Sequence, residues 1–233
     1  MDLKLNQKSN LHPKKYFAQM FKEGELVLDV GCWNFSFKKY CDGINVTNVE
    51  HYGVDRENPN EEIPQDYTFK KVELNQEPLP FADNTFDAIM ASHVIEHVTD
   101  QLGFMKELFR VLKVGGTVYV ECPSVRSMLF PSMPFKYEEF RSLNYYDDPT
   151  HFGRPHSPQS LYRLFRMFDG EVLKCDYIVQ KSLRWKFPYL ISKALITRNG
   201  AMLEEVIWKT LGFAVFGIAR KQAEAERKYV LSA

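Results

Sequence analysis

Short apolar runs separated by polar stretches predict several buried strands along this chain. Leu26–Leu28 is continuously apolar, which is typical of a strand buried on both faces of a parallel sheet. His51–Val54 predicts a second strand. Val72–Val98 is expected to supply the third and the fourth, with the fourth at Ala88–Ala91. The pattern indicates a chain built on a central sheet.

Stretches with helical spacing lie between these strands. Thr99 or Asp100 can cap a helix whose apolar residues recur at helical spacing. Gly115 and Gly116 are expected to end that helix, and a strand at Thr117–Glu121 follows. Further helices are predicted at His12–Phe21 and at Phe37–Cys41. Another is predicted to begin at Ser157 and to end at Gly170.

A less regular part follows a sixth strand expected at Glu171–Val179 and precedes a last strand at Phe213–Ala219. Phe187–Ile196 is apolar and aromatic, and Met202–Leu211 carries one apolar stripe. We expect two helices here, packed on the sheet or contacting a second copy of the chain as a homodimer. Association with a membrane surface is disfavoured, because the basic residues are too few to form a face.

The length and composition fit one domain with one sizeable core. The chain has 233 residues, of which 45% are hydrophobic. We predict a single domain over residues 1–233, with its core at about 12–180 and 212–221 and a helical insertion at about 182–211. Lys plus Arg and Asp plus Glu number 30 each, so no net charge attracts nucleic acid or an anionic membrane, and small or neutral substrates are favoured.

Cysteine usage and hydropathy indicate a cytoplasmic protein. The four cysteines show no C-x-x-C spacing, and the polar start MDLKLNQKSN lacks the apolar core of a signal peptide. No apolar run approaches the length of a membrane-spanning helix.

The first strand ends abruptly in a turn that suggests a binding site. Asp29 and Gly31 close the strand, and a glycine there allows a tight turn and close approach of a ligand. The turn has neither the Gly-Lys-Ser/Thr ending of a phosphate loop nor the G-x-G-x-x-G of a dinucleotide site. Asp55 lies 24 residues beyond Gly31, close to the spacing at which an acid meets ribose hydroxyls in nucleotide-binding α/β folds.

The turn resembles the first motif, D-x-G-x-G-x-G, of class I S-adenosylmethionine-dependent methyltransferases, although Trp33 and Phe35 replace its second and third glycines. A second region resembles the type 11-like, small-molecule members of that class, which carry L-P-F-x-D-x-S-F-D followed by a strand and an E-H pair. The matching residues here are Leu79, Pro80, Phe81, Asp83, Phe86, Asp87, Glu96 and His97.

The resemblance implies the fold and the cofactor. The fold is a Rossmann-like, doubly wound, mostly parallel seven-stranded sheet with an antiparallel last strand. The cofactor is S-adenosylmethionine, and the family acid that contacts adenine falls on Asn75. The residues expected to bind the cofactor are Asp29, Gly31, Cys32, Trp33, Asp55, Arg56, Leu74, Asn75, Ser92 and His93.

Catalytic and acceptor residues are expected after the fourth and fifth strands. His97 and His151 are the candidate bases, while His93 and His156 stay open as alternatives. The long segment Cys122–His156 is expected to cover the acceptor, with Tyr145, Tyr146 and Arg154 facing it. Asp147, Asp148, His151 and His156 do not have the spacing of a closed metal site, so no metal is predicted.

The expected reaction is transfer of a methyl group to an oxygen or nitrogen of a small polar acceptor, for example a sugar or a sugar-linked metabolite. Three alternatives remain at this point. They are a cofactor-binding protein without catalysis, an RNA or protein methyltransferase, and a nicotinamide-dependent oxidoreductase, which the missing glycines disfavour.

Overall fold

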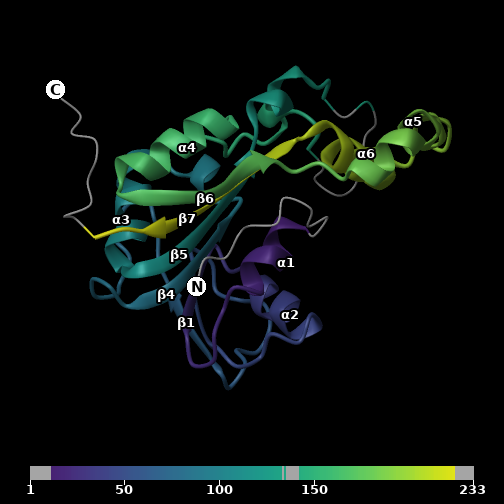
Figure 1. Cartoon of the computed structure of the whole chain (residues 1–233). Coiled ribbons are helices and arrows are strands. Elements are labelled where there is room, and N and C mark those ends of the chain that lie inside the picture. Colours follow the sequence, from purple (N-terminus) through teal and green to yellow (C-terminus); the bar gives the residue numbers. More distant parts are fainter. Residues whose placement is uncertain (1–11, 133, 135–141, 224–233) are drawn as a thin grey trace.

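A seven-stranded sheet forms the centre of the molecule in a computed structural model that describes residues 12–132, 134 and 142–223 (Figure 1). The strand order is β3-β2-β1-β4-β5-β7-β6, and β7 runs antiparallel to both of its neighbours. This confirms the fold that the resemblance implied. The strands are β1 (Leu26–Val30), β2 (Glu50–Asp55), β3 (Tyr67–Lys71), β4 (Phe86–Ser92), β5 (Leu112–Pro123), β6 (Gly170–Tyr177) and β7 (Ala214–Lys221).

Helices cover both faces of this sheet because side chains of the central strands point alternately to either side. In β4, Ile89 and Ala91 belong to the core under α3 (Gln101–Val111) and α4 (Pro158–Met167). Ala88 and Met90 belong to the core under α1 (Pro13–Ala18) and α2 (Ser36–Gly43). Both faces of β4 are therefore buried, as its continuous apolar run predicts.

The junction between α3 and β5 corrects two predicted boundaries. The helix ends at Val111, before Gly115 and Gly116, and β5 already begins at Leu112. Leu112 pairs with Phe86, so the two glycines lie inside an irregular strand. A side chain on Gly116 would come within 2.8 Å of the Asp87 carbonyl oxygen, so this glycine permits close strand approach and does not stop a helix.

The third strand also lies outside its predicted range. It occupies Tyr67–Lys71, immediately before Val72, and pairs in parallel with β2. Only Tyr67 is buried and Phe69 is half-buried, while the other three residues of this edge strand are exposed, so it lacks the apolar run used to find the other strands.

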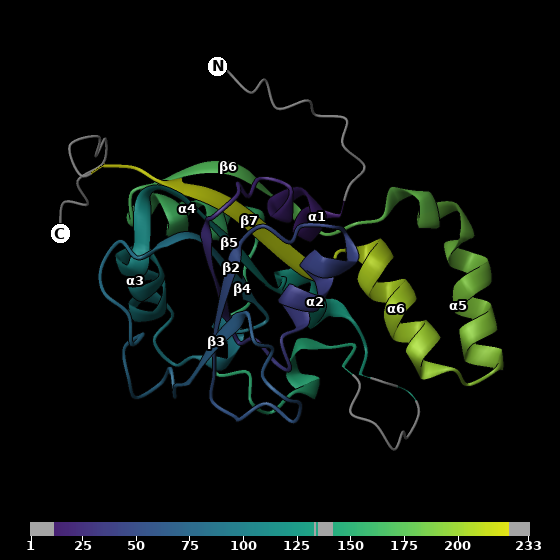
Figure 2. The same cartoon turned by 90° about the horizontal axis from the view of Figure 1, so that it is seen from below.

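Two helices follow β6 and stand at one end of the molecule, side by side in Figures 1 and 2. They are α5 (Phe187–Ile196) and α6 (Gly200–Leu211), preceded by the 3-10 helix η4 (Lys181–Lys186). Ile207 of α6 packs in a small core of its own, whereas Ile196 of α5 is 83% exposed. That this face contacts a second copy stays a prediction. No helix in the described parts of the chain is long and apolar enough to cross a membrane.

The segment after β5 contains short 3-10 helices. They are η2 (Val125–Leu129) and η3 (Tyr145–Asp147), while residues 133 and 135–141 of the expected acceptor cover lie outside the described residues. A further one, η1 (Ile95–His97), follows β4 directly. Gly153 of the segment donates its main-chain N–H to the Glu96 carbonyl oxygen at 2.9 Å, which fastens the segment to η1.

Candidate functional site

A cavity of about 480 Å³ lies at the carboxyl ends of β1, β2 and β4. Nine of the ten predicted cofactor residues line it. These are Asp29, Gly31, Trp33, Asp55, Arg56, Leu74, Asn75, Ser92 and His93. The tenth, Cys32, is absent from the described lining; its thiol is buried beside Tyr67, and burial raises its pKa to about 12. His97 also lines the cavity, and the acceptor candidates Tyr145, Tyr146, His151 and Arg154 do not.

Asp29 offers an unpaired carboxylate oxygen at this cavity. The residue is only 3% exposed, and its Oδ2 atom has no hydrogen-bond partner among the described residues. Burial raises the pKa of Asp29 to about 7, although Lys14 and a main-chain hydrogen bond from Phe37 oppose the shift. A buried polar oxygen without a partner is costly, so this position suits a ligand group that carries a positive charge or donates hydrogen bonds.

Gly31 makes the turn that opens the cavity. Its φ of +73° is in the left-handed region, and a Cβ there would lie 2.4 Å from Cγ2 of Val94. The main-chain N–H groups of Gly31 and Cys32 both donate to the carbonyl oxygen of Val54, at 2.9 and 3.2 Å. No side chain fits this position without a shift of its surroundings.

Phe35 stands where the family motif has its third glycine, and its backbone adopts the left-handed conformation that glycine favours. Phe35 has φ +60°, and the preceding Asn34 has φ +50°. The Phe35 ring is buried and packs edge-on against Tyr67, with ring centroids 4.7 Å apart. This aromatic contact offsets the cost, about 1 to 2 kcal/mol, of placing a non-glycine residue in the left-handed region. The departure from the glycine motif therefore leaves a left-handed turn in place.

Asp55 holds the loop and keeps acceptor capacity towards the cavity. Its Oδ2 accepts from the Trp33 N–H at 3.1 Å, and its Oδ1 accepts from the Glu57 N–H at 3.2 Å. A carboxylate offers about four lone-pair sites, so roughly two remain for a diol.

Asn75 lines the cavity with a side chain that is already engaged. Its Oδ1 accepts from the N–H and the hydroxyl of Thr99, at 2.8 and 3.1 Å, and its amide group donates to the His97 carbonyl at 3.2 Å. A contact of Oδ1 with an adenine amino group would require one of these bonds to give way.

His93 bridges two buried carboxylates at the floor of the cavity. Its Nδ1 lies 3.1 Å from Glu96 and its Nε2 lies 3.2 Å from Glu121. Burial alone would lower the pKa of His93, but the hydrogen bonds to Glu121 and Glu96 outweigh it and raise the pKa to about 9. Burial would raise the pKa of Glu121, whereas Lys14, 3.5 Å away, and His93 lower it to about 2. The ring is therefore an imidazolium at neutral pH and donates both of its N–H groups.

Trp208 of α6 packs on this histidine. The Trp208 and His93 rings stack with centroids 5.9 Å apart, and the indole also stacks on Phe213 with centroids 4.2 Å apart. The indole N–H donates to the Ser142 carbonyl at 2.9 Å. A cation over an indole ring is favourable, so this contact also stabilises the charged form of His93.

The predicted catalytic histidines lie against each other. The ring centroids of His97 and His151 are 4.9 Å apart. Tyr145 is buried and donates its hydroxyl to the Gly153 carbonyl, whereas Tyr146 is 72% exposed. Arg154 is exposed. Their roles towards an acceptor stay predictions.

Sequence reasoning missed Lys14 and the second carboxylate of the His93 pair. Lys14 lines the cavity and contacts Glu121, although the two residues are far apart in the sequence. Lys14 carries no local motif, and Glu121 looks like the polar end of an ordinary strand. A buried acid at a strand end next to the ligand edge of the sheet was the one available signal.

Comparisons with known proteins find similar methyltransferases. Residues 28–120 match the family described as a methyltransferase domain. An uncharacterized methyltransferase of Schizosaccharomyces pombe is 31% identical over 135 residues, which are 53% of this chain and 48% of that protein. The ubiquinone/menaquinone biosynthesis C-methyltransferase UbiE of Haemophilus ducreyi is 49% identical over 49 residues, 21% of this chain and 19% of that protein. The chain thus spans about half or less of the length of these relatives.

Solved structures share the fold at low sequence identity. A Haloferax volcanii complex between the Trm112 methyltransferase activator and a methyltransferase aligns with a TM-score of 0.66 and 15% identity, over 90% of this chain and 88% of that chain. An S-adenosylmethionine-dependent methyltransferase from Archaeoglobus fulgidus aligns with a TM-score of 0.55 and 18% identity, over 89% and 92%. Residues 28–120 thus carry a methyltransferase domain by their family match, and the sheet order and the cavity at its carboxyl edge are those that the resemblance to class I S-adenosylmethionine-dependent methyltransferases implied.

Proposed function

We propose that this chain transfers the methyl group of S-adenosylmethionine to an oxygen or nitrogen atom of a small polar acceptor. The observation that carries the proposal is the cavity that brings Asp29, Gly31 and Asp55 together at one edge of the sheet. The balanced charge of the chain supports a small acceptor over a nucleic acid.

The residues of the cavity fit the two polar ends of this cofactor. The unpaired Oδ2 of Asp29 suits the ammonium group of the methionine part. Asp55 suits the two ribose hydroxyls, because its carboxylate has lone pairs left after binding two main-chain N–H groups. The left-handed Gly31 and Phe35 support a loop that curves around the methionine part.

The main task of the protein in this reaction is to position the methyl donor and the acceptor. S-adenosylmethionine supplies a methyl group that its sulfonium charge already activates. The chain has to hold donor and acceptor in line at about 3 Å and to exclude water. His93 is unsuited as a base because both of its nitrogens face carboxylates and its pKa is raised to about 9. His97, which lines the cavity, is the better candidate to accept a proton from the acceptor.

S-adenosylhomocysteine is expected to raise the melting temperature of the protein, and NAD is not. A ligand at a hundred times its dissociation constant stabilises the folded state by about 2.7 kcal/mol, which a thermal-shift assay detects easily. A shift with NAD and none with S-adenosylhomocysteine would contradict the proposed function.

An Asp55→Ala variant tests whether the ligand sits in this cavity. Its affinity for S-adenosylhomocysteine should fall by about 1.5 to 3 kcal/mol, the range for hydrogen bonds to a charged group. Its melting temperature without ligand serves as the control for folding. Equal affinity in the variant and the wild type would place the ribose elsewhere.

The affinity for S-adenosylhomocysteine should rise with pH up to about 7 and then level off. Binding of an ammonium group favours the ionised form of Asp29, so below its pKa of about 7 a proton must leave when the ligand binds. Well below that pKa each pH unit then costs close to tenfold in affinity, and the loss between pH 7 and pH 5 is about 50-fold. Isothermal titration calorimetry over this range measures the effect.

An Asp29→Asn variant is the matched control for that profile. The amide has nearly the same shape but does not titrate, so its weaker binding should be independent of pH from 5 to 8. A wild-type affinity that is flat over the same range would remove Asp29 from the ammonium site.

A further inference from the structure

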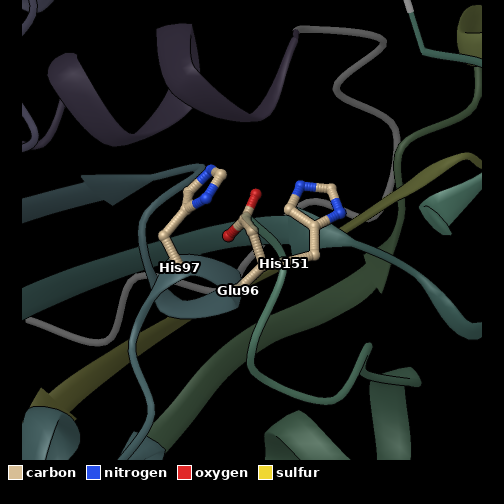
Figure 3. A group of neighbouring side chains, drawn as sticks. All are labelled: Glu96, His97 and His151. Carbon is tan, nitrogen blue, oxygen red and sulfur yellow. The ribbon is translucent and has the colours of Figure 1, made fainter. Parts of the chain in front are cut away.

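We propose that Glu96, His97 and His151 bind a divalent transition-metal ion at the wall of the cavity. Figure 3 shows the Glu96 carboxylate between the two imidazole rings. One potential ligand atom of each residue lies within 4.8 Å of the other two. Glu96 and His97 come from η1, and His151 comes from the segment that follows η3, 54 residues later in the chain.

The carboxylate of Glu96 has one oxygen left over. Its Oε1 bonds to Nδ1 of His93 at 3.1 Å, whereas Oε2 has no hydrogen-bond partner among the described residues. Glu96 is 1% exposed, so water does not satisfy this oxygen from the bulk. A buried charged oxygen without a partner is costly, and a bound cation is one of the few groups that removes that cost.

Both histidines use Nδ1 for a main-chain contact, which leaves Nε2 to bind a metal, although Nε2 of His151 also faces the Asp148 carboxylate at 3.7 Å. Nδ1 of His97 lies 3.2 Å from the Thr150 carbonyl oxygen, and Nδ1 of His151 lies 2.6 Å from the Tyr145 carbonyl oxygen. A carbonyl only accepts, so in each ring the proton is on Nδ1 and the neutral ring has its lone pair on Nε2. Hydrogen bonding of one imidazole nitrogen to the main chain is the usual support of a histidine that ligates through the other.

The two segments that carry the ligands are fastened together. The Gly153 N–H donates to the Glu96 carbonyl at 2.9 Å. The Gln101 amide donates to the carbonyls of Ile95 and Arg154, at 3.0 and 3.1 Å. These contacts fasten the residues that follow His151 to η1 and to Gln101, which reduces the ordering that metal binding has to impose.

The ligand types select the class of metal. Two imidazoles and one carboxylate suit Zn²⁺, Fe²⁺, Mn²⁺ or Co²⁺, whereas Mg²⁺ and Ca²⁺ prefer oxygen ligands. Metal–ligand bonds of about 2.0 to 2.2 Å put neighbouring ligand atoms roughly 3.4 Å apart around one ion. The three atoms therefore draw together when the ion binds, which small side-chain rotations achieve.

An ion pair without metal is the competing explanation of the cluster. Nε2 of His151 lies 3.7 Å from Oδ2 of Asp148, so a protonated His151 between Asp148 and Glu96 would also balance the charge. The two explanations differ in what they predict for metal titration, because a protonated imidazole has no lone pair to offer.

The ion would lie next to the place where an acceptor binds, because His97 lines the cavity. Three protein ligands leave coordination positions open, and these can take oxygen atoms of an acceptor. This part rests on the proposed function and narrows the acceptor to one that presents a hydroxyl or similar oxygen. A His97 that ligates the ion through Nε2 has no lone pair left for a proton, so with the ion bound the role of His97 is to hold the metal and not to act as the base. The binding of the ion itself does not depend on the proposed function.

Titration of the metal-stripped full chain with Zn²⁺ tests the proposal by calorimetry. We expect one ion per chain with a micromolar or smaller dissociation constant, and no comparable binding of Mg²⁺. His97→Ala and His151→Ala should each weaken Zn²⁺ binding at least about 100-fold, the upper end of the effect of removing a group that only supports a ligand. His12→Ala, which removes an exposed histidine outside the cluster, should bind like the wild type.

The wild-type chain loaded with Co²⁺ tests the open positions. Addition of azide should change the visible spectrum of the bound Co²⁺, and an unchanged spectrum would mean that the ion is closed to an acceptor. If the wild type did not bind Zn²⁺, or if His97→Ala and His151→Ala bound Zn²⁺ as tightly as the wild type, the metal site would be overturned in favour of the ion pair. S-adenosylhomocysteine titration of the same metal-stripped protein tests the proposed function separately.

Discussion

Replacing Gly31 by Ala should lower the free energy of unfolding by about 2 to 5 kcal/mol and abolish detectable binding of S-adenosylhomocysteine. Two costs add. A non-glycine residue at φ +73° costs about 1 to 2 kcal/mol, and forcing a methyl group against Val94, 2.4 Å from its Cγ2, costs about 1 to 3 kcal/mol more. Urea denaturation measures the loss of stability, and calorimetry measures the loss of binding.

Gly115→Ala is the matched control for this variant. Gly115 has φ +83° but no atom within 4 Å of an added Cβ, so it carries the backbone cost without the clash. The double variant Gly31→Ala with Val94→Ala should recover part of the stability relative to its Val94→Ala parent. If Gly31→Ala were no less stable than Gly115→Ala, the clash with Val94 would not exist in solution.

His93→Ala should destabilise the protein at pH 7 by about 3 to 5 kcal/mol, the range for breaking a buried ion pair by removing one partner. The change leaves Glu96 and Glu121, which are 1% and 5% exposed, without the cation between them. Urea denaturation at several pH values gives the difference from the wild type.

The difference in stability between wild type and His93→Ala should be largest near neutral pH. The folded-state pKa of His93, about 9, lies above its unfolded value of about 6.5. The stability that the charged ring contributes is therefore fully present below pH 6.5 and is lost as the pH rises through 9. At low pH the variant recovers because its unpaired carboxylates take up protons. The difference should narrow at both ends.

Glu121→Gln in the His93→Ala background tests the same pair from the other side. It removes the charge of one of the two buried carboxylates that lose the imidazolium, although Lys14 stays 3.5 Å from it, so the double variant should be more stable than His93→Ala alone. A double variant less stable than His93→Ala would show that the ion pair with Lys14 outweighs the burial of the Glu121 charge.

Much of the fold could be predicted because each central strand has a continuous apolar run in its own sequence. Val27 and Leu28 are buried in the two cores on opposite faces of the sheet, and this requires a continuous apolar run, which Leu26–Leu28 displays. The edge strand β3 does not require such a run, and its predicted position within Val72–Val98 is wrong, because the strand occupies Tyr67–Lys71. The end of α3 was wrong because Gly115 and Gly116 serve strand pairing, and glycine alone does not distinguish that use from a helix stop.

The cofactor side of the candidate site was more predictable than the acceptor side for a similar reason. Asp29 and Asp55 each lie at the end of a buried strand, so the sequence around each residue is enough to place both at one edge of the sheet. The charge of His93 depends on Glu121, which is 28 residues away in sequence and reaches it only across β4 and β5. The meeting of His151 with Glu96 likewise depends on tertiary contacts through Gly153, which no spacing rule contains.

The stack of Trp208 on His93 makes the helical insertion part of the energetics of the cavity. Any molecule that docks on the exposed side of α5 and shifts α6 alters the indole that supports the imidazolium. Linkage is reciprocal, so a ligand in the cavity that favours one position of that indole changes the affinity of the docked molecule by the same factor. A second copy or another partner that docked on α5 and moved α6 would therefore change cofactor affinity without touching the cofactor.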